Sequence, residues 1–369
     1  MRLALRELRR RPGRFAVAAV ILTLIAMLLM FLGGLLDGLV AGSTGALRAQ
    51  RGDLIVYSAT AQDSLVRSRI TAPVRAQVET AAGAGEVAGL GSVQLGARID
   101  GHGPRDLVPV VLFGVDRTPR GMPDAVPGPG RAYADDSLRS EGVRQGATVL
   151  LGPARTPVTV VGFLSDSRFS GQGTLWGSLD TWRAVLAANR PGARVGPGVV
   201  QALVVSAADP GASARAIDAA TAGATHTLTI AQAIDALPGV SQQQTVFNQI
   251  IGVTVVIALV VVALFFALIT VERIGLYGVL KAMGASSGTL FAGVLLQALV
   301  VTAIASALGV AASLALDALI PAGSIPFVAT PARLLSSVAY LIVAALIGCA
   351  FSLRRVLKVD PAAAIGGDQ

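Results

Sequence analysis

Four side chains in one apolar segment have the types and the spacing of a ligand-binding face. Met27, Met30, Gly34 and Asp37 are separated by three, four and three positions, so a helix would carry them on one side. Thioether sulfur and carboxylate oxygen are ligands that haem iron accepts. Gly33 and Gly34 would leave a notch for a flat molecule or for a facing helix. The pattern therefore indicates a candidate haem-binding face.

The same residues have a structural alternative, in which the glycines pack helices and Asp37 ends the segment in the headgroup region. A carboxylate at the outer end of a membrane helix is costly unless it has a role or contacts water. If the face does bind a ligand, Phe247 of the second apolar segment is a candidate wall residue. The residues alone leave both interpretations open.

A membrane helix must position this face. Residues 15–36 hold no charged side chain over 22 positions, enough to cross a bilayer core of about 30 Å. Further apolar runs follow at about 247–271, 290–316 and 334–353. The chain is 53% apolar and 14% charged, which is typical of a membrane protein with a substantial soluble part.

Basic residues indicate how the four spans are oriented. Six arginines lie in the first 14 residues, and Arg354, Arg355 and Lys358 follow the last span. The positive-inside rule puts both ends and the loop after span two in the cytoplasm, and the segment between spans one and two outside. We expect a multi-pass protein of the cell membrane that contacts lipid. Because the +8 net charge flanks the spans, we expect no nucleic-acid partner.

The segment between spans one and two has the pattern of a separate α+β domain, with short strands and helices mixed between Gly, Pro and polar turns. Residues 228–245 suggest a helix that docks back onto span two. The strands are expected at 53–58, 108–115, 148–151, 158–163 and 203–206, and the helices at 73–82, 179–188 and 212–221.

The fold class expected is thus an α-helical membrane protein with four transmembrane helices and an α+β extracytoplasmic domain inserted between helices 1 and 2. The segments expected are an interfacial helix at 1–14, transmembrane helix 1 at 15–40, the outer domain at 41–244, transmembrane helix 2 at 245–271, a cytoplasmic coupling helix at 272–288, transmembrane helix 3 at 289–319, an outer loop at 320–332, transmembrane helix 4 at 333–357 and a cytoplasmic tail at 358–369.

Several kinds of chemistry have no pattern in this sequence. There is no G-x-x-x-x-G-K-[ST] phosphate loop, no H-E-x-x-H and no G-x-S-x-G. The two histidines, His102 and His226, are far apart in the outer segment. We therefore expect no catalytic residue, no metal site and no catalytic cofactor, and we expect any ATP hydrolysis to come from a partner subunit.

The loop between spans two and three reads VERIGLYGVLKAMGASS. Leu276, Val279 or Leu280, and Met283 recur at helical spacing, and Gly284 is a plausible helix end. The pattern ER-x(5)-LKA-x-GA resembles the cytoplasmic loop of MacB/FtsX-type ABC transporter permeases, which contacts the ATPase subunit. The resemblance assigns ATPase coupling to Glu272, Arg273, Tyr277, Leu280, Lys281 and Met283.

Two further segments carry the same resemblance. YADDSLRSEGVRQGATVLL followed by TPVTVVGFL is similar to the outer domain of MacB-type permeases, and the ending KVDPAAAIGG is similar to the haem-export, HrtB-like branch. Most MacB-type loops have an Arg-Glu pair where this chain has Gly275, Leu276 and Tyr277. The HrtB-like branch also lacks the pair, so the departure fits that branch and argues against an ion-pair contact there.

The resemblance implies a permease subunit of an ABC-type efflux pump. It implies two copies of an ATPase subunit that carries ATP-Mg, a second permease copy in a homodimer, and haem as the transported substrate, taken from the outer leaflet and expelled by ATP-driven closure. Two other functions stay open. One is export of a lipid, a peptide or an antibiotic, and the other is FtsX-like signalling to a cell-wall hydrolase without transport.

Overall fold

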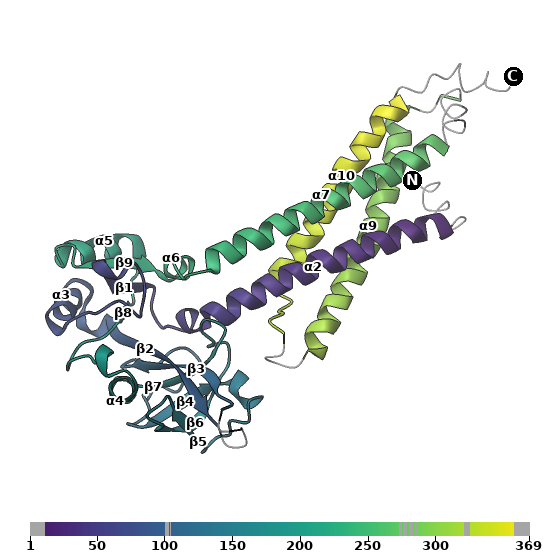
Figure 1. The fold of residues 1–369 in the computed structure, drawn as a ribbon. Helices are drawn as coiled ribbons and strands as arrows, with labels where there is room; N and C mark the ends of the chain where they lie inside the picture. Colours follow the sequence, from purple (N-terminus) through teal and green to yellow (C-terminus); the bar gives the residue numbers. More distant parts are fainter. Residues whose placement is uncertain are drawn as a thin grey trace. The chain divides into compact units, whose positions relative to one another are not determined.

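The computed structural model describes residues 12–99, 103, 105–272, 275, 279, 283–284, 286–320 and 325–357. The chain divides into two compact units, residues 1–38 with 244–369 and residues 39–243. The first unit holds the membrane helices, and the second is an α+β domain inserted between the first two of them (Figure 1). The predicted fold class is confirmed. Most of the interfacial helix expected at 1–14, and the whole tail expected at 358–369, lie outside the described residues.

Four helices are long and apolar enough to cross a membrane, as predicted. Leu22, Phe266, Ala298 and Cys349, one from each helix, are buried in the same apolar cluster. Small side chains such as Ala298 allow helices to approach closely where no water drives them together. The helices are α2 (Pro12–Arg48), α7 (Val240–Glu272), α9 (Ser287–Leu319) and α10 (Pro331–Leu357).

The inserted domain begins and ends with two β-α-β units that share a sheet. The strands lie in the order β2-β8-β1-β9, and all neighbours are antiparallel. This chain order and strand order form the ferredoxin-like arrangement, and α3 and α5 pack against each other. The elements are β1 (Leu54–Ser58), α3 (Ala72–Ala82), β2 (Val87–Arg98), β8 (Ala202–Val205), α5 (Pro210–Ala220) and β9 (Thr225–Thr229).

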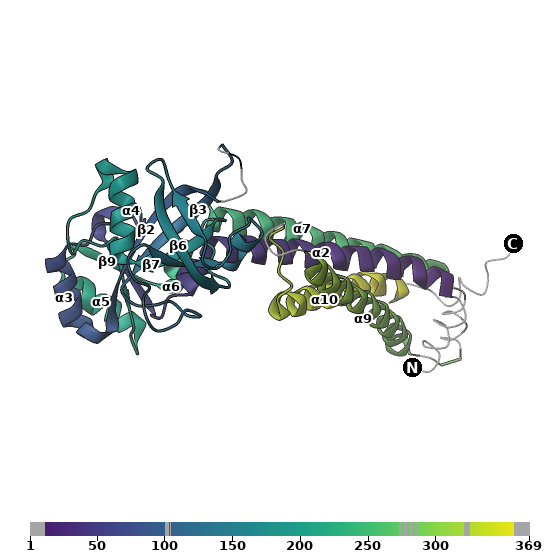
Figure 2. The same cartoon turned by 90° about the horizontal axis from the view of Figure 1, so that it is seen from below.

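A ring of six strands is inserted between β2 and β8. β2 pairs with β3, β3 with β7, β7 with β4, β4 with β6, β6 with β5, and β5 with the end of β2. The helix α4 (Leu179–Asn189) packs on β2, β3 and β7 (Figure 2). The remaining strands are β3 (Val108–Val115), β4 (Arg131–Asp135), β5 (Thr148–Leu151), β6 (Thr156–Leu164) and β7 (Gly173–Ser178).

Strand β2 belongs to both parts of the domain. Residues Val87–Leu90 pair with β8, Ala97–Arg98 pair with β5, and Leu90–Ala97 pair with β3 on the opposite edge. The sequence analysis missed β2, β4, β7 and β9. β2 contains three glycines, which have low strand propensity, and this explains why its pattern was weak.

Those glycines make room for a large side chain. Gly91 and Gly114 are paired across β2 and β3, and the fully buried Trp182 of α4 lies on both. A Cβ atom at Gly91 would lie 2.5 Å from the Trp182 ring, and one at Gly114 would lie 2.3 Å from Trp182 Cβ. The tryptophan therefore requires glycine at both positions.

The helix expected at 228–245 is a correction. Residues Thr225–Thr229 form strand β9, and a short helix, α6 (Ile230–Asp235), follows. Thr229 and Gln232 form a capping box that begins α6, and Gly239 has a φ of 85° just before α7 begins. Ala233 of α6 is buried in an apolar cluster of the inserted domain, so α6 does not dock on span two.

We expect Gly114→Ala to lower the free energy of unfolding of the inserted domain by about 1–3 kcal/mol, because overpacking forces side chains out of their rotamers. The control is Gly128→Ala, where an added Cβ meets nothing within 4 Å. Thermal unfolding followed by tryptophan fluorescence measures both. Equal stability of the two variants would show that the Trp182 contact tolerates a side chain.

Candidate functional site

Asp37 lies near the end of the part of α2 that belongs to the membrane unit, and it is paired. Its carboxylate accepts a hydrogen bond from Arg333 Nη2 at 2.6 Å and from Arg333 Nε at 3.2 Å. Thr330 Oγ1 donates to the second carboxylate oxygen at 2.8 Å. The side chains of Arg333 and Asp37 are 24% and 22% exposed, so the pair is largely removed from solvent.

The start of α10 explains why Arg333 reaches Asp37. Pro331 is the first residue of the helix, a position where its missing N–H costs nothing. The Thr330 hydroxyl accepts from Arg333 N at 3.3 Å while it donates to Asp37. One threonine therefore begins the helix and also fixes the acid. The N-terminal end of α10 favours the negative charge of Asp37 as well.

Three glycines of α2 form a groove for the segment that leads into α10. A Cβ atom at Gly33 would lie 2.5 Å from Arg333 Cδ, and one at Gly34 would lie 2.4 Å from the Phe327 ring. At Gly38 a Cβ would lie 2.1 Å from the carbonyl oxygen of Pro326. The main chain also joins the two segments, because Val328 N donates to Gly34 O at 3.1 Å.

The notch predicted at Gly33 and Gly34 is therefore filled by this chain's own side chains. Phe327 is buried and stacks on Phe31 of α2, with ring centroids 5.7 Å apart and planes inclined by 19°. A facing segment, one of the two occupants considered from the sequence, lies in the notch. A flat ligand that binds there must displace Phe327 or Arg333.

The predicted ligand residues do not share one surface. Met30 is buried at 1% exposure, beside Gly309 of α9, where a Cβ would lie 3.3 Å from Met30 Sδ. Met27 is 40% exposed, and Phe247 of α7 is half-buried. Gly34 and Asp37 do lie together, through Phe327 and Arg333. Helical spacing alone placed all four α2 residues on one face, but i and i+3 differ by about 60° around a helix axis.

Arg333, Thr330 and Phe327 were missed as site residues. A signal for Arg333 did exist, since an acid at the end of a membrane helix calls for a cation, and Arg333 begins the fourth span. Their pairing with α2 joins residues 296 positions apart, which no local pattern predicts. Among the described residues, no group of three or more His, Cys, Asp or Glu side chains could hold a metal ion.

The cytoplasmic loop is described only in part. Arg273, Tyr277, Leu280 and Lys281 lie outside the described residues, and Glu272 is the last residue of α7. Met283 N donates to Val279 O at 3.0 Å, and Gly284 has a φ of 92°, a conformation that commonly ends a helix. Val279 and Met283, four residues apart, are 51% and 71% exposed.

Comparison with known proteins identifies the membrane helices. Residues 248–361 match the family model of the FtsX-like permease C-terminal domain. The predicted resemblance to FtsX-type permeases is confirmed for this region, which includes most of α7 and all of α9 and α10. The chain is a multi-pass membrane protein, and its basic flanks place the inserted domain outside the cytoplasm.

Curated relatives match over about a third of the chain. A hemin transport system permease protein, HrtB, of Staphylococcus haemolyticus is 32% identical over 133 residues, which is 36% of this chain and 38% of that protein. The HrtB protein of Staphylococcus epidermidis is 28% identical over 127 residues, 34% and 36% of the two chains. An uncharacterized ABC transporter permease of Mycobacterium tuberculosis is 34% identical over 121 residues, 30% and 31% of the two chains.

Among solved structures, the extracellular domain of the ABC-type transporter YknZ from Gram-positive bacteria aligns with a TM-score of 0.32 and 12% identity. The alignment covers 48% of this chain and 98% of that one.

We expect Asp37 and Arg333 to be coupled by about 1–3 kcal/mol, because removing either partner leaves a largely buried charge unpaired. A double-mutant cycle of Asp37→Asn and Arg333→Gln, followed by thermal unfolding of the detergent-solubilised chain, measures the coupling. The control cycle pairs Arg333→Gln with Asp317→Asn. Asp317 lies near the end of α9 and binds Ala329 N, so its effect should add to that of Arg333. Additivity in both cycles would contradict a stabilising ion pair.

Proposed function

We propose that this chain, which carries an FtsX-like permease domain, is the membrane subunit of an ABC-type efflux pump that takes haem from the outer leaflet and expels it. The observation that carries the proposal is the match of this chain to relatives named as hemin transport permeases. The proposal extends those names to this chain, because the match spans less than two fifths of each relative.

The chemistry at the outer end of α2 supports haem as substrate. Haem offers a flat apolar ring, an iron that accepts oxygen or sulfur ligands and carboxylate side chains. Asp37 supplies an oxygen, Arg333 supplies a cation, and Phe31 and Phe327 supply aromatic faces. Gly34 lets Phe327 lie close to α2, and Met27 and Phe247 offer apolar contact from more exposed positions.

Binding at this site requires an exchange of partners. The Asp37 carboxylate is held by Arg333 and Thr330, so it can reach iron only if Arg333 gains another anion. A haem carboxylate is such an anion. Met30, buried against α9, would contribute a wall contact or would reach iron only after α2 and α9 separate.

ATP-driven motion would supply the energy for release. We propose that two copies of an ATPase bind a homodimer of this chain, through the loop that contains Glu272, Arg273, Tyr277, Leu280, Lys281 and Met283. The exposed apolar side chains of Val279 and Met283 suit a protein contact at the cytoplasmic surface. A substrate is expelled only if the ATP-bound state binds it more weakly than the other state does.

We expect the purified chain to bind haemin with a shifted Soret band, and two variants to weaken that binding differently. Asp37→Ala should change the position of the band, because it removes the axial oxygen. Arg333→Gln should lower the affinity about 10- to 100-fold, as loss of a charge-assisted contact does, and should leave the band in place. Asp317→Asn is the matched control.

A parent spectrum in Asp37→Ala would place the iron ligand elsewhere. If the parent chain binds no haemin at all, the substrate is wrong, and export of a lipid, a peptide or an antibiotic, or signalling to a hydrolase, takes its place.

We expect Met283→Asp to abolish co-purification of the ATPase with this chain, because the contact would bury an unpaired carboxylate at a cost of a few kcal/mol. Met283→Leu keeps the apolar contact and should co-purify as the parent does. Membrane insertion, checked by the yield of detergent-extracted chain, should be equal for both. Normal ATPase recovery with Met283→Asp would remove this surface from the coupling contact.

A further inference from the structure

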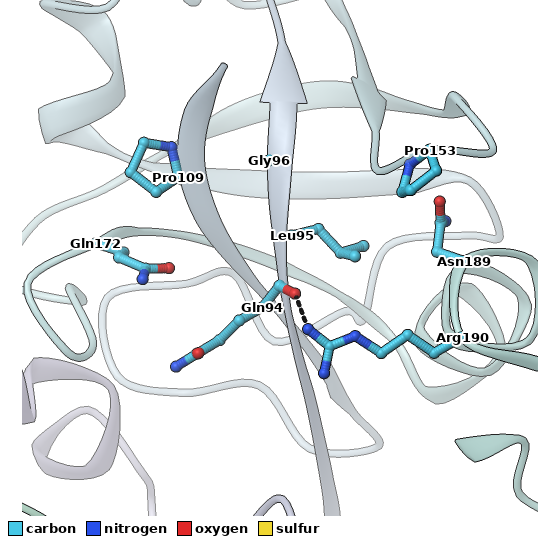
Figure 3. A pocket seen from close by; sticks show the side chains of 8 residues that line it. All are labelled: Gln94, Leu95, Gly96, Pro109, Pro153, Gln172, Asn189 and Arg190. Carbon is cyan, nitrogen blue, oxygen red and sulfur yellow. Dashed lines mark hydrogen bonds between the residues drawn. The ribbon is translucent and has the colours of Figure 1, made fainter. Parts of the chain in front are cut away.

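A cavity of about 400 Å³ lies on the inserted domain where strand β2 passes from the ferredoxin-like sheet into the six-stranded ring. It has apolar walls as well as amide and guanidinium groups, which come from both sides of β2 (Figure 3). Its lining residues are Gln94, Leu95, Gly96, Pro109, Pro153, Gln172, Asn189 and Arg190.

The cavity exposes part of a strand edge. On the edge opposite β3, β8 reaches only to Leu90 and β5 begins only at Ala97. Gly91–Gly96 therefore has no strand on that edge. Since a residue rises about 3.4 Å along a strand, the uncovered edge is about 20 Å long, enough for several residues of another chain.

Side chains stand in for the missing strand. Ser92 N donates to the Gln201 side chain, and Gln94 O accepts from Arg190 Nη2 at 2.8 Å. Gly96 O accepts from the main-chain N–H of Gly152 at 2.9 Å. These bonds show that even-numbered residues of β2 present their main-chain groups to this edge. The N–H of Gln94 points the same way, between the reach of β8 and that of β5.

Two polar groups beside this edge have capacity left. Arg190 is exposed, uses one N–H on Gln94 O, and has no acidic partner among the described residues. The side-chain oxygen of Gln172 is buried and accepts no hydrogen bond within the described part of the chain. A buried acceptor without a donor is costly. The cavity thus offers a cation for an anion and an acceptor for an N–H group.

We propose that the Gly91–Gly96 edge binds an extended, acidic peptide segment of a partner protein outside the cytoplasm. The peptide main chain pairs with Gln94 N–H and Gln94 C=O and takes the place of Arg190 there, as in strand addition to a sheet edge. The released guanidinium then binds an Asp or Glu of the peptide. Leu95, Pro109 and Pro153 contact its apolar side chains, and Gln172 accepts an N–H. The proposal is independent of the transported substrate.

The test uses the full-length chain in lipid nanodiscs and a phage-displayed library of random octapeptides. Selected peptides should be enriched in Asp or Glu. Arg190→Gln should weaken their binding at least tenfold in fluorescence polarisation, whereas Arg215→Gln, an exposed arginine on α5, should not. Gln94→Pro removes the edge N–H without touching the β3 ladder and should also weaken binding.

Synthetic versions of a selected peptide separate strand pairing from simple charge attraction. N-methylation of alternate peptide nitrogens should abolish binding in one register and spare it in the other. Equal binding of both methylated forms, binding that is unchanged in Arg190→Gln, or a library that yields no acidic peptide would overturn the proposal. Free glutamate that competes with the same affinity as the peptide would also overturn it, in favour of a site for small acids.

Discussion

A carboxylate beside hydrocarbon must have a cation or water as partner, and the pairing of Asp37 with Arg333 meets this requirement in the membrane unit. The pair joins α2 to the first turn of α10. Because Arg333 is the third residue of α10, the preceding residues must run along α2, and they do so over Gly33, Gly34 and Gly38. The electrostatic requirement of one side chain thereby determines where the loop lies and which positions of α2 must lack a side chain.

The inserted domain meets a similar requirement with main-chain groups. A strand edge that no strand covers leaves N–H and C=O groups that need partners. On β2, Gln201 and Arg190 supply these partners from side chains. Side-chain partners differ from a strand because they can rotate away. The edge is therefore satisfied in the structure and still accessible to another chain.

The parts that follow from local pattern were predictable from the sequence. Four apolar runs of sufficient length predict four spans, and alternating or β-branched runs such as 108–115 predict strands. Strand β2 failed because its glycines serve Trp182, which is 91 positions from Gly91. Arg333 failed for the same reason, since its role depends on an acid in another helix. Met30 was placed on a ligand face by spacing, but packing against Gly309 decides its surroundings.

Charge balance gives the proposed haem site its selectivity. In the structure each charged group has one strong partner, Asp37 with Arg333. Haem would give iron to Asp37 and a carboxylate to Arg333, so both groups exchange partners and neither is left bare. A neutral lipid offers a partner to neither group, so opening the pair for it would expose two charges near hydrocarbon, which is strongly unfavourable. An anion without a Lewis acid would satisfy Arg333 alone and leave Asp37 unpaired. Only a ligand that carries both functions opens the pair without a large electrostatic penalty.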